Sequence, residues 1–368
     1  MRQNRVLILG PSLVAVGGVT THLNQLFNSD LSEKFELIHF QVGSEGRREN
    51  TLQRVARIAL SPFIFFISLI RYRPEIVHFN TSLDAKSFWR DVIYLLIARA
   101  LNRKIVFQKH GGPLPQEFFA GYPLLASLLK SVLKYTDVII LLGFEEEKSY
   151  KQFLPDSRIE VIPNAIDARA LTSEPLSNDK HAPLRLIYLG RLARNKGVFE
   201  ILDAFASLIK QGRDLRLTIG GIGSEGVHLR ERAKNLGLGS QVVFAGMVSG
   251  EIKDKLWRES QVFVFPTYHR EGLPYSLLEA MAAGAVPIIT PIGAIPDVMQ
   301  DEVHGVFVKG KDSSGLARAI AMLDDDRLKL ARMSEAGRKR VLENYTVGHL
   351  VDSLSSVYFS LMTSIQRE

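Results

Sequence analysis

The sequence predicts an α/β fold made of two parallel-sheet domains, and three observations support this class. Short apolar segments alternate with longer segments of helical character, which is typical of a parallel sheet with helices on both faces. The alternation occurs in both halves of a chain of 368 residues, a length sufficient for two domains of ordinary size. A hydrophobic content of 46% and a charged content of 23% are those of a soluble globular protein.

Each half contains six apolar segments that we expect to form strands. In the first half they are residues 6–10, 36–40, 76–79, 105–108, 138–141 and 159–162, with helices expected at 19–27, 87–101 and 144–153. In the second half they are residues 184–190, 215–220, 242–244, 262–265, 286–289 and 305–308. Two Rossmann-like domains follow, in which ligands bind beyond the carboxyl ends of the strands. We therefore expect the site in the cleft between the domains.

The expected domains are residues 1–168 and 184–345, joined by a hinge at 167–183. That hinge is rich in Ser, Asn, Asp and Pro and has no apolar period. Residues 346–368 form a separate helical segment, because Leu350, Leu354, Val357 and Leu361 have helical spacing. The apolar run at residues 6–9 is too short for a signal peptide, and we expect it to form the first strand of the fold.

The bulk charge and the cysteine count limit the possible partners. A net charge of +7 favours anionic partners, of which a nucleoside diphosphate and a membrane surface are better candidates than nucleic acid. No recognition helix, zinc-finger spacing or aromatic–basic sheet motif supports a nucleic-acid binder. The absence of cysteine excludes disulfides and thiolate metal sites and fits a reducing cytoplasm.

Residues 262–287 combine an apolar strand, a polar loop and a short helix that begins near Ser276. Glu271 lies in the loop and Glu279 lies in the first turns of the helix. The helix N-terminus attracts anions, whereas the two carboxylates suit sugar hydroxyls. An alternative remains open, because Ser276-Leu-Leu-Glu279 also fits a capping box in which Glu279 bonds the Ser276 backbone.

A basic loop follows the strand at 184–190. It reads Gly190-Arg191-Leu-Ala-Arg194-Asn-Lys196-Gly197 and leads into a helix. Arg offers a fork to two phosphate oxygens and Lys a point charge, so the loop can bind a diphosphate without a metal. Arg194 lies outside this core and is expected at the surface.

Glycines and one histidine follow other strands. Gly17 and Gly18 stand at a helix start, and Gly221 and Gly223 follow the strand at 215–220. Glycine lets a backbone approach a ligand closely, although either loop could be an ordinary turn. His110 follows the strand at 105–108, where a structural role is the alternative.

Taken together, these strings resemble retaining family 4 glycosyltransferases, the glycosyl transferases group 1 proteins of GT-B fold. The resemblance rests on E-G-L-P-Y-S-L-L-E, G-R-x-x-x-x-K-G, the Gly17-Gly18 pair and His110-Gly111. It implies that Glu271 holds donor-sugar hydroxyls, Glu279 holds the ribose, and Arg191 and Lys196 hold the diphosphate, with His110 beside the sugar. The other donor-binding residues that it implies are Gly17, Gly18, Gly190, Gly221, Gly223, Gly272, Leu273, Pro274, Leu277 and Leu278. It further implies that the C-terminal helix crosses back to the N-terminal domain.

The expected activity is transfer of a sugar from a nucleotide-diphosphate sugar to an acceptor hydroxyl, without cofactor or metal. Uridine is the commonest base in the family, and a lipid-linked saccharide for surface polysaccharide is the expected acceptor. Two alternatives stay open: a catalytically inactive sugar- or lipid-binding subunit, and a sugar-nucleotide 2-epimerase of the same fold. The first would be expected to lack Arg191, Lys196 or Glu271, and all three are present.

Residues 51–73 have the most unusual composition of the chain. An apolar run from 58 to 70 is flanked by arginines and is too short for a bilayer span, and Pro62 is expected to interrupt a helix. One interpretation is a helix buried on the sheet. The other is a peripheral anchor on the cytoplasmic membrane, extended by residues 114–135, with arginines on anionic headgroups and a phenylalanine at the interface. The residues of that anchor are Arg47, Arg48, Arg54, Arg57, Phe63, Phe65 and Phe66.

Overall fold

The computed structural model describes residues 3–47, 49–169, 171 and 182–365, with the side chains of 364 and 365 left out. The chain forms two compact units. The N-terminal unit comprises Met1–Ala165 and Val347–Glu368, and the C-terminal unit comprises Ile166–Thr346. Most of the predicted hinge lies outside the described residues.

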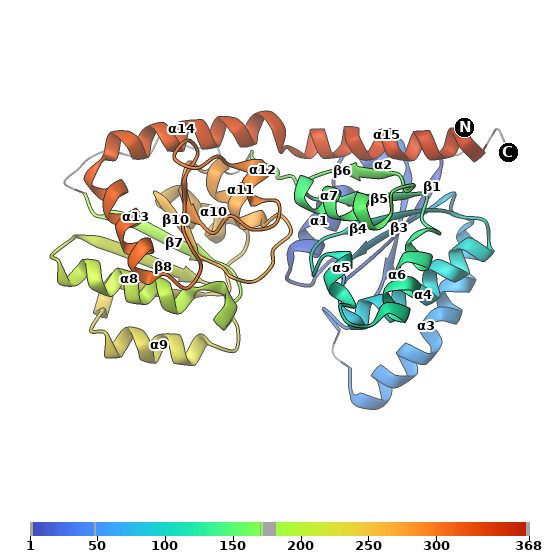
Figure 1. The fold of residues 1–368 in the computed structure, drawn as a ribbon, viewed down its shortest axis with the longest axis horizontal. Coiled ribbons are helices and arrows are strands. Elements are labelled where there is room, and N and C mark those ends of the chain that lie inside the picture. Colours follow the sequence, from blue (N-terminus) through green and yellow to red (C-terminus); the bar gives the residue numbers. More distant parts are fainter. Residues whose placement is uncertain (1–2, 48, 170, 172–181, 366–368) are drawn as a thin grey trace. The chain divides into compact units, whose positions relative to one another are not determined.

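The N-terminal unit is built on a six-stranded sheet in the order β2-β1-β3-β4-β5-β6, with all neighbours parallel (Figure 1). The strands are β1 (Arg5–Gly10), β2 (Glu36–Gln41), β3 (Ile76–Thr81), β4 (Lys104–Lys109), β5 (Val138–Leu141) and β6 (Ile159–Val161). The helices are α1 (Gly18–Phe27), α2 (Leu31–Lys34), α3 (Thr51–Tyr72), α4 (Ala85–Ala100), α5 (Pro115–Phe118), α6 (Pro123–Leu133), α7 (Phe144–Phe153) and α15 (Val347–Ile365).

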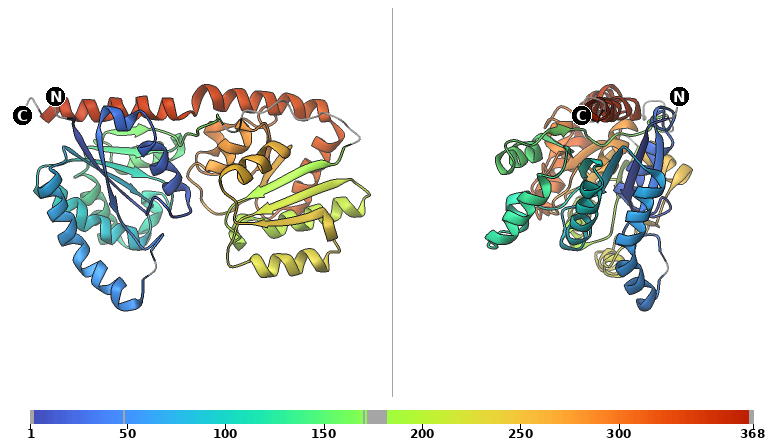
Figure 2. Two further views of the ribbon diagram at one scale, coloured as in Figure 1. Left: turned by 180° about the vertical axis from the view of Figure 1, so that it is seen from behind. Right: turned by 90° about the vertical axis from the view of Figure 1, so that its right-hand side faces the viewer.

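Alternate residues of these strands enter two cores, one on each face of the sheet. Leu7 packs with residues of α3, α4, α6 and α7, whereas Ile8 packs with residues of α1 and α15. Because both faces are covered, β1 and β5 are apolar at most positions, whereas β2, β3 and β4 also contain polar residues. Helix α15 lies along this sheet (Figures 1 and 2), and its Tyr358 hydroxyl is 2.6 Å from Nδ1 of the buried His78. The C-terminal helix therefore completes the core of the N-terminal unit.

The C-terminal unit has a second parallel sheet, in the order β12-β11-β10-β7-β8-β9. Its strands are β7 (Leu184–Leu189), β8 (Leu215–Gly220), β9 (Val242–Gly246), β10 (Val262–Phe265), β11 (Val286–Ile289) and β12 (Val306–Phe307). Its helices are η1 (Arg194–Lys196), α8 (Val198–Lys210), α9 (Gly226–Asn235), η2 (Gly239–Gln241), α10 (Gly250–Glu259), α11 (Tyr275–Ala282), α12 (Ile295–Val298), α13 (Ser313–Asp325) and α14 (Arg327–Asn344). The predicted α/β class with two Rossmann-like domains is confirmed, and β5, β8, β10 and β11 have the predicted ends.

Both sheets contain a point at which the strand order reverses. It lies between β1 and β3 in the N-terminal unit and between β7 and β10 in the C-terminal unit. The loops after two such strands diverge to opposite faces, which leaves a crevice at the carboxyl edge of the sheet where ligands bind in folds of this type.

Helix α3 differs from both parts of its prediction. It continues through Pro62 for 22 residues, because the Ser61 hydroxyl donates to the Ile58 carbonyl (3.2 Å), which the missing N–H of Pro62 leaves without its helical donor. A buried helix is also wrong, since only 11% of its most apolar 18-residue window is buried. Phe65, expected at a membrane interface, is instead buried against Phe40 and Tyr94.

Residues 114–135, the second predicted part of the membrane surface, include both core residues and exposed residues. Phe118 and Phe119 pack against the core of the N-terminal unit. Tyr122 and Leu124, in contrast, are exposed, with 65% and 85% of their surface accessible. Tyr135 is also exposed, at 45%, so part of this segment is accessible to a membrane and part of it is core.

Candidate active site

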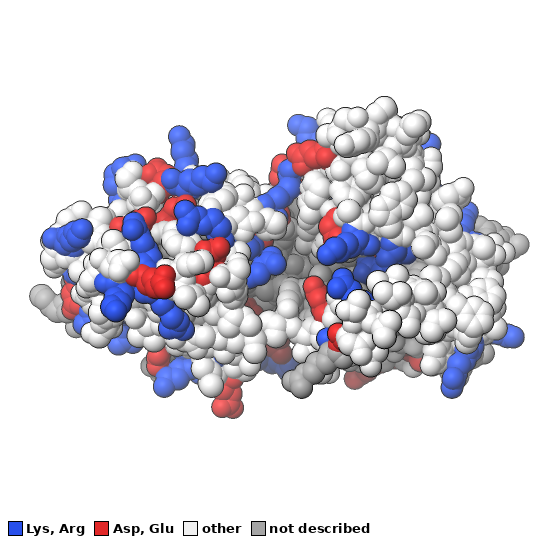
Figure 3. All heavy atoms as spheres, turned by 90° about the horizontal axis from the view of Figure 1, so that it is seen from below, with Lys and Arg blue, Asp and Glu red and all other residues white. Residues whose placement is uncertain are grey.

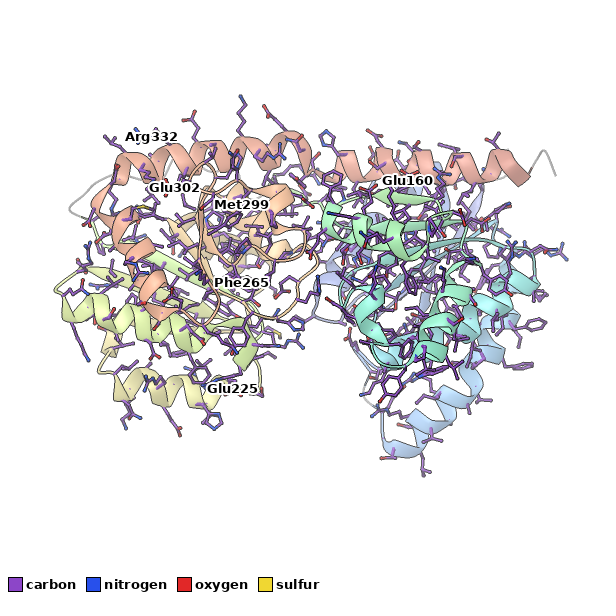
Figure 4. The ribbon with its side chains drawn as sticks, viewed as in Figure 1. Glu160, Glu225, Phe265, Met299, Glu302 and Arg332 are labelled. Atoms are coloured by element: carbon purple, nitrogen blue, oxygen red, sulfur yellow. The ribbon has the colours of Figure 1, made fainter. Side chains whose placement is uncertain are left out.

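The reversal point of the C-terminal sheet brings together a cation and a carboxylate. Strand β7 ends at Leu189 and leads through Gly190 and Arg191 into η1, while β10 ends at Phe265, labelled in Figure 4, and leads to Glu271. Nζ of Lys196 donates to Oε1 of Glu271, and both side chains are largely buried, with 9% and 14% accessible. A charged pair thus lies at the carboxyl edge, where a ligand of this sheet would bind.

Neighbouring groups fix Glu271 from two sides. The Thr267 hydroxyl donates to the same carboxylate oxygen at 3.0 Å. Gly293 approaches the backbone so closely that a Cβ there would be 2.0 Å from the Glu271 carbonyl, and the Ala294 N–H donates to Gly272 O (3.1 Å). Gly293 has φ of +59°, so glycine is also required by conformation. The carboxylate therefore has a defined position before any ligand arrives.

The η1 turn is joined to the β10 loop through Asn195. Its carbonyl accepts from the N–H groups of Tyr268 (3.0 Å) and His269 (3.1 Å). Gly197 follows with φ of +76°, and a Cβ on it would be 2.3 Å from the Pro266 carbonyl. These contacts hold Lys196 over the Phe265 ring, 5.5 Å from its centre.

The two predicted phosphate-binding cations, Arg191 and Lys196, differ in exposure and in pairing. Arg191 is exposed, and its guanidinium makes no hydrogen bond or ion pair within the described part of the chain. Its backbone carbonyl, in contrast, accepts from the Tyr188 hydroxyl at 2.8 Å. Arg194 stacks on the Phe199 ring (4.2 Å), away from Glu271. The turn therefore presents one unpaired cation, Arg191, and one that is held by a carboxylate.

Glu279 is bound by side chains of α10 and does not cap its own helix. Its Oε1 accepts from Lys253 Nζ at 2.7 Å and its Oε2 from Trp257 Nε1 at 3.1 Å. Helix α11 begins at Tyr275 after an N-cap at Pro274, so Ser276 is already helical. The capping-box alternative is therefore wrong.

The leucines of the motif have fully buried side chains. Leu277 and Leu278 belong to the core, and Leu273 is nearly as buried. The Leu277 N–H donates to Pro274 O at 3.1 Å. Any contact of these residues with a donor must therefore involve the backbone.

The glycines that follow β7 and β8 pack two loops together. Gly221 has φ of +133°, and a Cβ there would be 1.8 Å from the Gly190 carbonyl. A Cβ on Gly223 would be 2.2 Å from the Leu192 carbonyl, and one on Gly190 would be 3.0 Å from the Tyr188 hydroxyl. The close approach that these glycines permit is to the protein's own backbone.

Gly17 in the N-terminal unit has no such constraint. Its φ of 162° is extended, and a Cβ added to it would meet no atom within 4 Å. Gly18 is the first residue of α1, and the Thr21 N–H donates to the Gly17 carbonyl at 3.0 Å. Nothing inside this unit requires glycine at position 17.

His110 follows β4 and is fixed by Asn80. Its Nε2 is 2.9 Å from Asn80 Oδ1, an acceptor, so Nε2 carries the proton and Nδ1 has the free lone pair. Burial, followed by the neighbouring His22 and His78, holds the pKa of His110 well below its usual value. The ring is therefore neutral at pH 7, and within the described residues Nδ1 has no hydrogen-bond partner.

Sequence reasoning did not find the residues that hold these groups. They are Asn80, Asn195, Lys253, Trp257 and Thr267. The only available signal was the i, i+4 spacing of Lys253 and Trp257, which places both on one face of α10. No group of three or more His, Asp and Glu residues arranged for a metal occurs among the described residues.

Comparisons with known proteins identify the class. Residues 16–170 match the model described as Glycosyltransferase Family 4, and residues 174–340 match that of Glycosyl transferases group 1. Sucrose-phosphate synthase from Thermosynechococcus elongatus superposes with a TM-score of 0.79 at 16% identity, covering 98% of this chain and 100% of that one. The HepE protein of Anabaena in complex with UDP-glucose gives 0.73 at 17% identity, covering 97% and 99%. The fold is the GT-B class of glycosyltransferases.

Proteins with similar sequences are also glycosyltransferases. A GDP-mannose-dependent phosphatidylinositol monomannoside mannosyltransferase of Mycolicibacterium smegmatis is 26% identical over 267 residues, which are 68% of each chain. An uncharacterised glycosyltransferase of Methanocaldococcus jannaschii is 26% identical over 182 residues, 50% of this chain and 46% of that protein. Because the two family models together span nearly all of 16–340, the chain belongs to the family 4 type of glycosyltransferases.

Proposed function

We propose that this glycosyltransferase moves a hexose from a nucleotide-diphosphate sugar, a uridine one, to an acceptor hydroxyl with retention of anomeric configuration. The acceptor in this proposal is a lipid-linked saccharide of surface-polysaccharide synthesis, and no metal or cofactor takes part. The proposal assigns the donor to the C-terminal unit and the acceptor to the N-terminal unit.

The observation that supports it most is the Lys196–Glu271 pair at the reversal point of the C-terminal sheet. A donor carries phosphates beside a sugar, so it needs a cation and a hydroxyl acceptor side by side. Lys196 supplies the first and Glu271 the second. Arg191, exposed and without an ion pair within the described residues, supplies a second cation on the same turn.

The charges that develop during transfer suit these groups. When the bond between the anomeric carbon and the phosphate oxygen breaks, negative charge grows on the diphosphate and positive charge on the sugar ring. Arg191 and Lys196 stabilise the former, and each such contact made only in the transition state supplies about 3 kcal/mol, or about 100-fold in rate. The acceptor oxygen bonds to the anomeric carbon on the same face, and its proton passes to the departing phosphate.

The comparisons favour a nucleotide donor without fixing its base. HepE was crystallised with UDP-glucose, and the mycobacterial relative is named as GDP-mannose-dependent. We propose that Glu279 holds the ribose hydroxyls. Lys253 and Trp257 already orient its carboxylate.

The N-terminal unit suits an acceptor attached to a membrane. Helix α3 has a mean hydropathy of 1.6 over its most apolar window. By length and composition alone it could cross a bilayer, contrary to the expectation that its apolar run is too short. It connects β2 to β3 of one parallel sheet, with Phe65 and Leu69 buried in the core. A helix anchored in this way fits peripheral contact on the cytoplasmic face better than a span.

A thermal-shift screen of UDP-, GDP- and ADP-sugars in a chelating buffer tests the donor. We expect a UDP-sugar to raise the melting temperature of the parent protein. Glu279→Gln should bind the nucleotide about tenfold more weakly, a loss of about 1.4 kcal/mol. Its loss of stability should be smaller than that, because the Gln oxygen can still accept from Lys253 or Trp257. A protein that none of the nucleotides stabilises would contradict the proposal and favour an inactive binding subunit.

A further inference from the structure

A large groove opens at the reversal point of the N-terminal sheet. Its volume is about 1000 Å³, and the carboxyl ends of β1, β2 and β3 form its floor, with α3 and α4 along its sides. None of the residues predicted from the sequence to bind the donor lines it.

Among the residues that the structure describes, five cations and two carboxylates line this groove. The cations are Arg47, Arg54, Arg57, Lys86 and Arg90, and the carboxylates are Glu45 and Asp84. Asp84 is already engaged as the N-cap of α4, where it accepts from the N–H groups of Lys86 and Ser87. Figure 3, which views the molecule from the side where α3 lies, shows Lys and Arg side chains gathered on this unit, with Asp and Glu side chains beside them and uncharged surface beyond.

The arginines are positioned by acids outside the groove lining. Glu49 binds Nε of Arg57 at 2.7 Å, and Asp91 binds Nε of Arg90 at 2.7 Å. When Glu49 and Asp91 are added to the two carboxylates that line the groove, the described residues still provide five cations against four carboxylates. Arg54 is exposed and makes no hydrogen bond or ion pair among the described residues. The Arg54 guanidinium group is therefore available to bind an anion.

The helix that carries two of these arginines is well defined at this end. Asn50 caps α3 by accepting from the Gln53 N–H (2.9 Å), and Gln53 Oε1 accepts from the Asn50 N–H (3.0 Å). Arg54 and Arg57 lie in the first two turns, where the helix dipole adds positive potential.

An apolar surface continues directly from the groove. Ile58 and Ile64 line it and are 57% and 49% exposed. Further along α3, Phe63, Phe66 and Ile67 are 62%, 40% and 46% exposed. A contiguous exposed apolar surface of this kind marks a binding surface.

We propose that this groove binds the phosphate or diphosphate that joins a saccharide acceptor to its lipid, while the lipid chain lies along the exposed face of α3. The inference deepens the proposed function, on which it rests. Arginine forks match phosphate oxygens, whereas a neutral saccharide has no need of several cations. The adjoining apolar surface distinguishes a phosphorylated lipid from a soluble phosphorylated sugar.

Binding of farnesyl diphosphate and of inorganic diphosphate, measured by calorimetry, tests both halves of the inference. The parent protein should bind farnesyl diphosphate more tightly. Arg54→Glu should weaken the binding of both ligands about tenfold or more, a loss of about 1.4 kcal/mol. The double substitution Phe63→Ser with Phe66→Ser should weaken the binding of farnesyl diphosphate and leave that of inorganic diphosphate unchanged. Arg332→Glu, a charge reversal at an exposed position of α14, is the matched control and should change neither.

Three results would overturn the inference. The first is an affinity for farnesyl diphosphate that Arg54→Glu leaves unchanged, and the second is equal affinity for the two ligands. The third is a dimer in solution that Phe63→Ser with Phe66→Ser dissociates, because the apolar face would then be covered by a second copy.

A nucleotide thermal shift separates this inference from the function on which it rests. Arg54→Glu should keep the parent response to the nucleotide sugar and the parent melting temperature. If the nucleotide binds and farnesyl diphosphate does not, only the groove assignment fails. If no nucleotide binds to the parent protein, the proposed function fails.

Discussion

Two glycine-containing loops, which sequence motifs alone would treat alike, have different roles in the two units. Gly221 and Gly223 let one strand-end loop of the C-terminal unit pack against another, so closely that a Cβ added to either would be within 2.2 Å of a carbonyl oxygen. Gly17 in the N-terminal unit has an extended backbone and open space around it. A glycine beside a strand end is therefore evidence for a ligand only when internal packing does not require it.

The charged groups, in contrast, do not divide between the two units in this way. In the C-terminal unit Lys196, Glu271 and Glu279 all have protein partners that fix their positions. In the N-terminal unit Arg54 lines an open groove and is unpaired among the described residues. Arg191 is the corresponding exposed cation of the C-terminal unit, and Glu49 and Asp91 hold Arg57 and Arg90 in the N-terminal unit. Each region therefore combines charged groups that the protein positions with an exposed cation that a ligand can reach.

The largest effect is expected from Glu271→Gln. This substitution removes the charge that holds Lys196 and weakens the predicted contacts with donor-sugar hydroxyls. We expect kcat to fall about 100-fold, or about 2.7 kcal/mol, because these contacts act at the reacting sugar. Nucleotide affinity should remain within a factor of a few. Release of UDP from UDP-glucose with water as the acceptor measures kcat for donor cleavage when the natural acceptor is not known. A loss confined to nucleotide affinity would contradict the assigned role.

An effect of similar size, but on stability, is expected from Gly221→Ala. The new Cβ would collide with the Gly190 carbonyl, and φ of +133° is unfavourable for alanine. We expect a loss of about 2–3 kcal/mol in the free energy of unfolding, measured in urea.

The control for that substitution is Gly212→Ala. Gly212 has φ of +81°, but a Cβ added to it would meet no atom within 4 Å. It isolates the conformational cost, about 1 kcal/mol. Equal losses at the two positions would mean that loop packing contributes nothing.

Acid should weaken the N-terminal unit through His22. Burial lowers the pKa of His22 to about 4, against about 6.5 in an unfolded chain. The unfolded state therefore binds the proton more readily, so stability is complete above pH 6.5 and falls as pH decreases toward 4. We expect roughly 2 kcal/mol to be lost between pH 7.5 and pH 5 from this group. Urea unfolding at both values should show a smaller loss in His22→Gln, and an unchanged loss would contradict the assignment.

The smallest stability effect is expected from Gly17→Ala. Because its Cβ meets nothing, the melting curve should indicate a change within about 0.5 kcal/mol. If Gly17 faces a ligand, transfer should nevertheless decrease. A marked loss of stability would contradict the open environment of this loop.

The sequence predicted the fold well because its signals are local. Apolar strands such as β8 and β10 are bounded by glycine or polar loops, and the motif around Lys196 and Glu271 follows such strands directly. Thr267, Lys253 and Trp257 were missed because their roles depend on which elements pack together. The extent of α3 was wrong because Ser61 compensates for Pro62, a contact that composition does not reveal.

The sequence left the exposure of α3 undecided for a different physical reason. Apolar residues in a soluble protein favour burial, so a helix of this composition was expected either in the core or at a membrane. The structure decides against the core, with Phe65 and Leu69 as the buried residues of the helix.

The most direct test of the account is UDP release from UDP-glucose by Lys196→Ala with Arg191→Ala in a chelating buffer. If these two cations neutralise the departing diphosphate without a metal, the parent protein keeps its rate in the chelator. The double variant should then lose at least about 100-fold, while Arg194→Ala stays near the parent rate. A double variant as fast as the parent, or a parent that requires a divalent ion, would contradict the account.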